Sequence, residues 1–125
     1  MKKIISTPKA PAAIGPYSQA IEANNTIYIS GQLPIDVATG ELPSGGIKAQ
    51  TQASFNNIKA ILAEVGLTTD HIVKTTVLLA DIKDFGEMNE VYTKQFTGTY
   101  PARSAFAVKD LPKGALVEIE VIAVR

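Results

Sequence analysis

The chain has 125 residues with 12 Lys or Arg against 12 Asp or Glu, so its formal net charge is zero, and we expect one domain over residues 1–125. It has no cysteine and one histidine, which excludes disulfides, thiol nucleophiles and Cys-ligated metals and leaves His71 as the only imidazole base. The even charge balance argues against a nucleic-acid binder, and the lack of an apolar leader or membrane-spanning run fits a cytoplasmic protein.

The first part of the chain is predicted to form three short strands. The predicted strands are residues 3–6, 19–23 and 26–30. The third is rich in β-branched and aromatic residues, and we expect it to stop at Gly31. Asn24 and Asn25 are placed to form a tight hairpin turn before it, because Asn tolerates a positive φ.

Helical spacing of apolar residues predicts two helices with a buried strand between them. The first helix is expected over residues 47–65, with Gly66 at its carboxyl end. The second is expected in the stretch 81–96, with Asp84 as its N-cap. The strand between them, residues 72–80, has apolar side chains on both faces, which is typical of a central strand covered on two sides.

The remaining predicted strands are residues 104–108 and 116–124, joined by a turn at 111–114. The resulting order of elements favours the α+β class, with both helices packed on one face of a sheet. In the last strand the second face begins acidic at Glu118 and ends apolar at Ile122 and Val124. That face is therefore expected to be partly covered by a partner subunit.

Two charged residues are the main candidates for chemistry. Arg103 follows Pro101 just before a predicted strand, where its guanidinium fork could bind a carboxylate in a cleft, although it could equally form a surface salt bridge. Glu118 lies between apolar neighbours, where partial burial would raise its pKa and suit an acid or base. It could also be an ordinary solvated strand residue.

Four other residues are weaker candidates. Tyr17 lies in a Gly-Pro turn that would fix the direction of its ring, and Gly31 would let a ligand approach the backbone. Asn89 could contact a ligand from a helix, and each of these residues also has a purely structural explanation. Ser30 as a nucleophile would need a base, and a Ser-His-Asp triad is rejected because His71 lies in a polar connector. No phosphate loop, dinucleotide fingerprint or metal-ligand spacing occurs.

Six stretches, in order from one end of the chain to the other, carry a resemblance to a known family. They are residues 10–19 (APAAIGPYSQ), 29–34 (ISGQLP), 73–77 (VKTTV), 88–92 (MNEVY), 101–104 (PARS) and 111–124 (LPKGALVEIEVIAV). Each is weak alone, but the six together are highly specific. Over essentially its whole length the sequence resembles the RidA family, also called the YjgF family.

The resemblance implies a chorismate-mutase-like α+β fold with a mixed sheet, assembled as a homotrimer with clefts between subunits and using no metal or cofactor. It implies enamine/imine deaminase activity: hydrolysis of 2-iminobutanoate and 2-iminopropanoate, released by pyridoxal-phosphate-dependent dehydratases, to 2-oxo acids and ammonia. One alternative is a non-catalytic binder of small 2-oxo acids or other carboxylates at the same clefts. A ribonuclease or translation inhibitor is disfavoured by the zero net charge.

The resemblance also implies roles for individual residues. The family's carboxylate-binding Arg corresponds to Arg103, and its water-activating Glu corresponds to Glu118. The other residues expected to bind substrate are Tyr17, Ser30, Gly31, Asn89 and Ala105. Most relatives have Cys or Thr and then Val where this chain has Ala105 and Phe106, so the larger Phe106 could change either the pocket or the packing.

Overall fold

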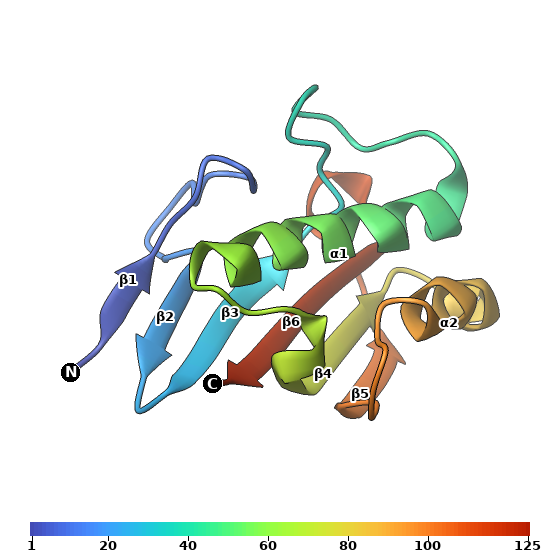
Figure 1. Cartoon of the computed structure of the whole chain (residues 1–125). Helices are drawn as coiled ribbons and strands as arrows, with labels where there is room; N and C mark the ends of the chain where they lie inside the picture. The colour runs from blue at the N-terminus through green and yellow to red at the C-terminus, as the bar shows by residue number, and fades with distance from the viewer.

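The computed structural model describes the whole chain, Met1–Arg125, as a six-stranded sheet with two helices on one face (Figure 1). The strands are β1 (Lys3–Ile5), β2 (Ala20–Ala23), β3 (Thr26–Gln32), β4 (Ile72–Leu79), β5 (Ala102–Ala107) and β6 (Val117–Val124), and the helices are α1 (Gly46–Glu64) and α2 (Phe85–Thr93). In the sheet order β1-β2-β3-β6-β4-β5, only β4 and β5 pair in parallel. The predicted α+β class, mixed sheet and single helical face are confirmed.

The third strand runs further than the sequence predicted. The turn before it forms as expected, with φ of 51° at Asn24 and 59° at Asn25. The strand, however, does not stop at Gly31 but continues to Gln32, because an irregularity in its pairing with β6 follows Ile29. This bulge keeps Gly31 in the sheet, beside β6.

The hydrophobic core lies between the sheet and the two helices. α1 crosses the sheet over β3 and β6 and packs beside α2 (Figure 1). The fully buried side chains of α1 include Phe55, Ile58 and Leu62, and burying each contributes about 1.5–3 kcal/mol. β6 alternates strictly, with Val117 and Ile119 among the residues buried beneath the helices and the intervening side chains on the opposite, open face.

The second helix is shorter than predicted. It begins at Phe85 and ends at Thr93, so Phe96 lies beyond it, although its ring is still buried in the core. Asp84 makes no capping hydrogen bond to the helix, and it is Asp81 whose side chain caps the short 3₁₀ turn that precedes it. Neither helix combines the length and the apolar character that a membrane crossing requires.

β5 begins earlier than predicted, and Arg103 lies inside this strand rather than in the loop before it. Parallel pairing places Arg103 beside Thr75 of β4 and Phe106 beside Leu78. Thr75 is fully buried beneath the helices. Because side chains alternate between the faces of a strand, Arg103 lies on the helix-covered face and Phe106 lies on the open face.

Candidate active site

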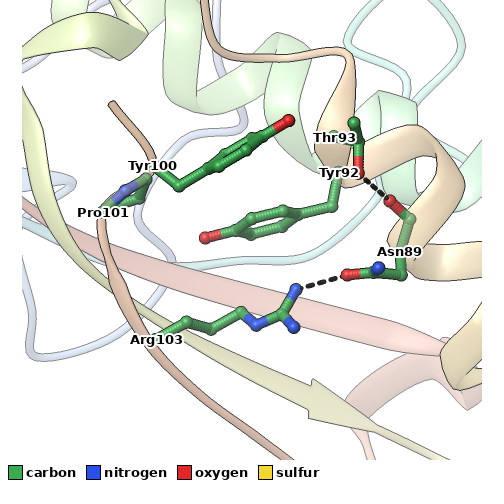
Figure 2. A pocket seen from close by; sticks show the side chains of 6 residues that line it. All are labelled: Asn89, Tyr92, Thr93, Tyr100, Pro101 and Arg103. Carbon is green, nitrogen blue, oxygen red and sulfur yellow. Dashed lines mark hydrogen bonds between the residues drawn. The ribbon is translucent and has the colours of Figure 1, made fainter. Parts of the chain in front are cut away.

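One group of candidate residues surrounds Arg103, between β5 and α2 (Figure 2). Nη1 of Arg103 donates a hydrogen bond to Oδ1 of Asn89 at 2.6 Å. The guanidinium carbon lies 4.6 Å from the ring centre of Tyr92 and 5.3 Å from that of Phe85. The pocket at this point has a volume of about 400 Å³. Its lining residues are Asn89, Tyr92, Thr93, Tyr100, Pro101 and Arg103.

The sequence of α2 explains why its side chains converge on Arg103. Phe85, Asn89 and Tyr92 are four and three residues apart, so they lie on one face of the helix. That face lies over β5 because Tyr92 is fixed to β4 by a 2.8 Å hydrogen bond between its hydroxyl and that of Thr75. Asn89 is a candidate from the sequence, whereas Tyr92, which lies in the same predicted helix, is not. The signal for Tyr92 was its helical spacing from Asn89.

A second group surrounds Glu118, on the open face of the sheet. Glu118 pairs with Leu78 and points away from the helices. A Cβ added at Gly31 would overlap Oε2 of Glu118 and lie 2.9 Å from its Cδ, so the carboxylate packs directly on the Gly31 backbone. Gly31, which is expected to let a ligand approach the backbone, instead lies against the side chain of Glu118.

The electrostatic environment of Glu118 favours its protonated form. Burial is the main cause that raises the pKa of Glu118, and the neighbouring charge of Glu120 raises it further. No cation forms an ion pair with Glu118. A carboxyl group with a raised pKa can accept a proton from water and return it within one reaction cycle.

Tyr17 and Ser30 lie beside Gly31. Tyr17 is 53% exposed and lines a pocket together with Gly31. The hydroxyl of Ser30 donates to the backbone oxygen of Ser18 at 2.6 Å, and its backbone N–H donates to that of Gln19 at 3.0 Å. Ser30 therefore ties the segment that carries Tyr17 to β3.

The candidate residues thus fall into two clusters within one chain. The helix-side cluster consists of Arg103, Asn89 and Ala105, and the open-face cluster consists of Tyr17, Ser30, Gly31 and Glu118. Arg103 is paired with buried Thr75, whereas Glu118 is paired with Leu78 three residues along β4, which places the two charged groups on opposite faces of the sheet. The first cluster can bind a carboxylate, and the second can exchange a proton with water. No three His, Asp or Glu side chains gather as a metal-binding group.

The mixed sheet with two helices on one face, an arginine without a counter-ion and a carboxyl group of raised pKa define the class, a small α+β protein with two charged groups on opposite faces of its sheet. The chain belongs to the family described as Endoribonuclease L-PSP, the RidA/YjgF family, whose model matches residues 7–125. The resemblance predicted from the sequence is confirmed.

Individual relatives are similar over the whole chain. The 2-iminobutanoate/2-iminopropanoate deaminase of Bos taurus is 54% identical over 125 residues, which are 100% of this chain and 91% of that protein. Among solved structures, YyfA of Yersinia pestis, described as a Rid-family protein of unknown function, superposes with a TM-score of 0.96 at 50% identity and covers 100% of both chains. E. coli TdcF with bound serine gives a TM-score of 0.93 at 44% identity, over 98% of each chain.

Proposed function

We propose that this protein is an enamine/imine deaminase, a hydrolase that converts 2-iminobutanoate and 2-iminopropanoate to 2-oxo acids and ammonia. The observation that carries the proposal is an Arg103 guanidinium held by Asn89 without a carboxylate partner, together with the raised pKa of Glu118. It is supported by 54% identity, over the full chain, to a protein named for this activity. We further propose that it acts in the cytoplasm, beside the dehydratases that release these imines.

In the proposed mechanism each charged group matches one part of the substrate. Arg103 binds the carboxylate through the N–H groups that Asn89 does not occupy, in the two-pronged geometry that a guanidinium provides. Glu118 lies against the electrophilic iminium carbon and takes a proton from the attacking water. The water oxygen bonds to that carbon while the second C–N bond of the iminium becomes the nitrogen lone pair, and Glu118 then gives the proton to this nitrogen. As the remaining C–N bond breaks and ammonia leaves, the hydroxyl proton passes to the Glu118 carboxylate and the C=O bond forms. General base catalysis of this kind contributes about 10²–10⁴-fold.

The proposed functional unit is a homotrimer with its active sites between subunits. The helix-side and open-face clusters lie on opposite faces of one sheet, so a neighbouring copy is needed to bring them to one substrate. The open face also carries Tyr28, Phe106 and Val124, which are 48%, 47% and 37% exposed in the single chain. Large apolar side chains exposed on the same face of a sheet are typical of a surface that binds a partner. A monomeric mass at micromolar concentration would contradict the trimer.

The activity is tested by competition with a chemical trap. A threonine dehydratase generates 2-iminobutanoate in the presence of semicarbazide, and the rate of semicarbazone formation is followed. The protein is expected to lower that rate because it hydrolyses the imine before the trap reacts. Unchanged trapping at a stoichiometric amount of the protein would exclude the deaminase proposal.

Complementation between inactive variants tests the shared site. Arg103→Ala and Glu118→Gln are each expected to be inactive alone. When they are co-expressed, about one interface in four combines an intact Arg103 with an intact Glu118, so about a quarter of the wild-type activity should return. Arg103→Ala co-expressed with the double variant Arg103→Ala/Glu118→Gln is the control and should stay inactive. No recovery in a mixed assembly would place both groups of one site in the same subunit.

A non-catalytic binder of small 2-oxo acids is the second candidate. It is favoured by the pocket beside Arg103, in which the guanidinium has no carboxylate partner. Both candidates need Arg103, but only the deaminase needs Glu118. Titration calorimetry with 2-oxobutanoate, compared with turnover in the trapping assay, separates the two. Binding without turnover in the wild type would favour the binder.

A further inference from the structure

Tyr92 connects the buried core to the guanidinium of Arg103. Its side chain is 4% exposed, and its ring centre lies 4.6 Å from the guanidinium carbon (Figure 2). Its hydroxyl forms a 2.8 Å hydrogen bond with that of Thr75, which is fully buried. The tyrosine is therefore fixed at its hydroxyl end and presents its ring to the arginine.

Two other rings determine how Tyr92 is oriented. Its ring centre lies 5.6 Å from that of Phe55, at an angle of 75°, and 5.1 Å from that of Phe96. Both neighbouring rings are buried, and neither contacts Arg103 in the cation–π geometry that Tyr92 and Phe85 adopt. Close packing on these sides leaves the ring little freedom to rotate.

The groups that hold Arg103 leave its charge unneutralised. Arg103 takes part in none of the ion pairs of the structure. It is held instead by two aromatic faces and by the neutral amide of Asn89. Aromatic rings attract a cation without cancelling its charge, so the guanidinium stays available to an anion. The arrangement fits a cation that is fixed in place for a ligand.

The hydroxyl of Tyr92 stays protonated and bonded to Thr75. Burial, which outweighs the opposing effects of Thr75 and Arg103, raises the pKa of Tyr92 above its ordinary value. The group is therefore neutral at physiological pH, and its hydroxyl is engaged with Thr75. The influence of Tyr92 on the site must pass through its ring.

We propose that Tyr92 is a positioning residue for the deaminase reaction, whose ring holds the Arg103 guanidinium in the plane that presents its free N–H groups to the substrate carboxylate. Thr75 fixes the ring and Asn89 fixes Nη1. This inference rests on the proposed function. An arginine that is ordered in advance loses less conformational entropy when the carboxylate binds, so the ring strengthens binding more than it speeds the chemical step.

Two substitutions at position 92 separate the ring from the hydroxyl. Tyr92→Leu removes the aromatic face, and we expect it to raise both KM and the Kd for 2-oxobutanoate about tenfold, with kcat lowered less than about threefold. Tyr92→Phe keeps the face and should restore both constants to within about threefold of wild type. Phe96→Leu is the matched control, because it removes another ring of the same buried cluster that does not contact the guanidinium. It loosens the packing of Tyr92 but keeps the ring face, so Kd should rise clearly less than in Tyr92→Leu.

A spectroscopic measurement tests the positioning directly. Restricted rotation of the Arg103 guanidinium should give separate ¹⁵N resonances for its two Nη groups in wild type and in Tyr92→Phe, and the resonances should merge in Tyr92→Leu. An unchanged Kd in folded Tyr92→Leu, or an equal increase in Phe96→Leu, would overturn the proposal. The Kd for 2-oxobutanoate is measured without turnover. Failure of the deaminase assay would therefore reject the proposed function, but the Kd values of the Tyr92 variants would still test whether Tyr92 positions Arg103.

Discussion

The helix-side and open-face clusters differ in how far one chain completes them. Arg103 is held by Asn89 and by two rings of α2, and all three groups come from its own chain. Glu118 lies on the bare backbone of Gly31 with no cation beside it, and its pKa is raised. The guanidinium is therefore held in place without a counter-ion, whereas the Glu118 carboxyl group has neither a cation nor a hydrogen-bond donor holding its charge.

The proposed substrate explains why the two clusters differ in this way. A 2-imino acid carries a carboxylate and, when protonated, an iminium cation on the adjacent carbon. Arg103 matches the first charge, and the second supplies the positive partner that Glu118 lacks. A carboxylate satisfied in advance by a lysine or arginine would hold its proton less strongly and act as a weaker base. The lack of a cation beside Glu118 therefore makes its carboxylate a stronger base for the proposed reaction.

The largest expected effect separates binding from chemistry. Glu118→Gln should lower kcat by about 10²–10⁴-fold, because the proton acceptor is lost, and should leave the Kd for 2-oxobutanoate unchanged. Arg103→Ala should instead abolish measurable binding. Titration calorimetry and the semicarbazide assay measure the two quantities. Glu120→Gln is the control, since Glu120 is exposed on the same face two residues away; if it lowers kcat as much, Glu118 has no special role.

A smaller effect is expected from the glycine beneath the carboxylate. The side chain of Gly31→Ala would overlap the Glu118 carboxylate and displace it, so kcat should fall about 10–100-fold while the Kd for 2-oxobutanoate stays the same. Gly86→Ala is the matched control in α2, where an added Cβ meets open space. It should keep full activity and gain about 0.4–1 kcal/mol of stability. Full activity in Gly31→Ala would show that the position of Glu118 does not matter.

Alternation along β6 explains how much of the open face was predictable. Its period of two is local to the strand, so the sequence alone correctly predicts that Glu118 and Ile122 share one side. The sequence alone does not place Arg103 inside a strand, because Pro101 and Gly98 indicate a loop. Parallel pairing with β4 is what extends β5 to Arg103, and that pairing is a long-range contact. The bulge at Gly31 likewise depends on β6, which lies far away in the sequence.

The helix-side cluster was predicted only in part for a different reason. Aromatic residues at helical spacing fill cores far more often than they contact ligands, so Tyr92 does not stand out in the sequence as a site residue. The structure shows that its ring packs in the core on one side and contacts Arg103 on the other. Phe96 continues the apolar spacing, so the predicted helical stretch includes it, but the residue lies beyond the end of α2. The same helical spacing thus covers two residues with different positions, Tyr92 inside α2 and Phe96 beyond its end.

The pH dependence of activity and the pH dependence of stability should both report the ionisation of Glu118, in the open-face cluster. Because Glu118 must be ionised to act as a base, the acid limb of kcat/KM should lie above the ordinary carboxyl pKa of 4.5. A raised pKa means that the folded chain binds this proton more tightly than the unfolded chain, so ionisation lowers stability as the pH rises through that value. Glu118→Gln should therefore raise Tm at pH 8 relative to wild type and leave it nearly unchanged at pH 4. A lower Tm at pH 8 would contradict the raised pKa.

The smallest effect on the site is expected at Phe106, whose influence the sequence left open between pocket and packing. Phe106 is 47% exposed on the open face, whereas Ala105 beside it packs against the core on the face of Arg103. Phe106→Val should therefore change the Kd for 2-oxobutanoate less than about twofold and weaken self-association, measured by sedimentation at decreasing concentration. Ala105→Val, the same side chain one residue away, should raise Kd because it crowds the arginine side of the sheet. If Phe106→Val is the variant that changes Kd, the two faces of β5 do not divide binding from assembly, and Phe106 reaches the site of a neighbouring copy.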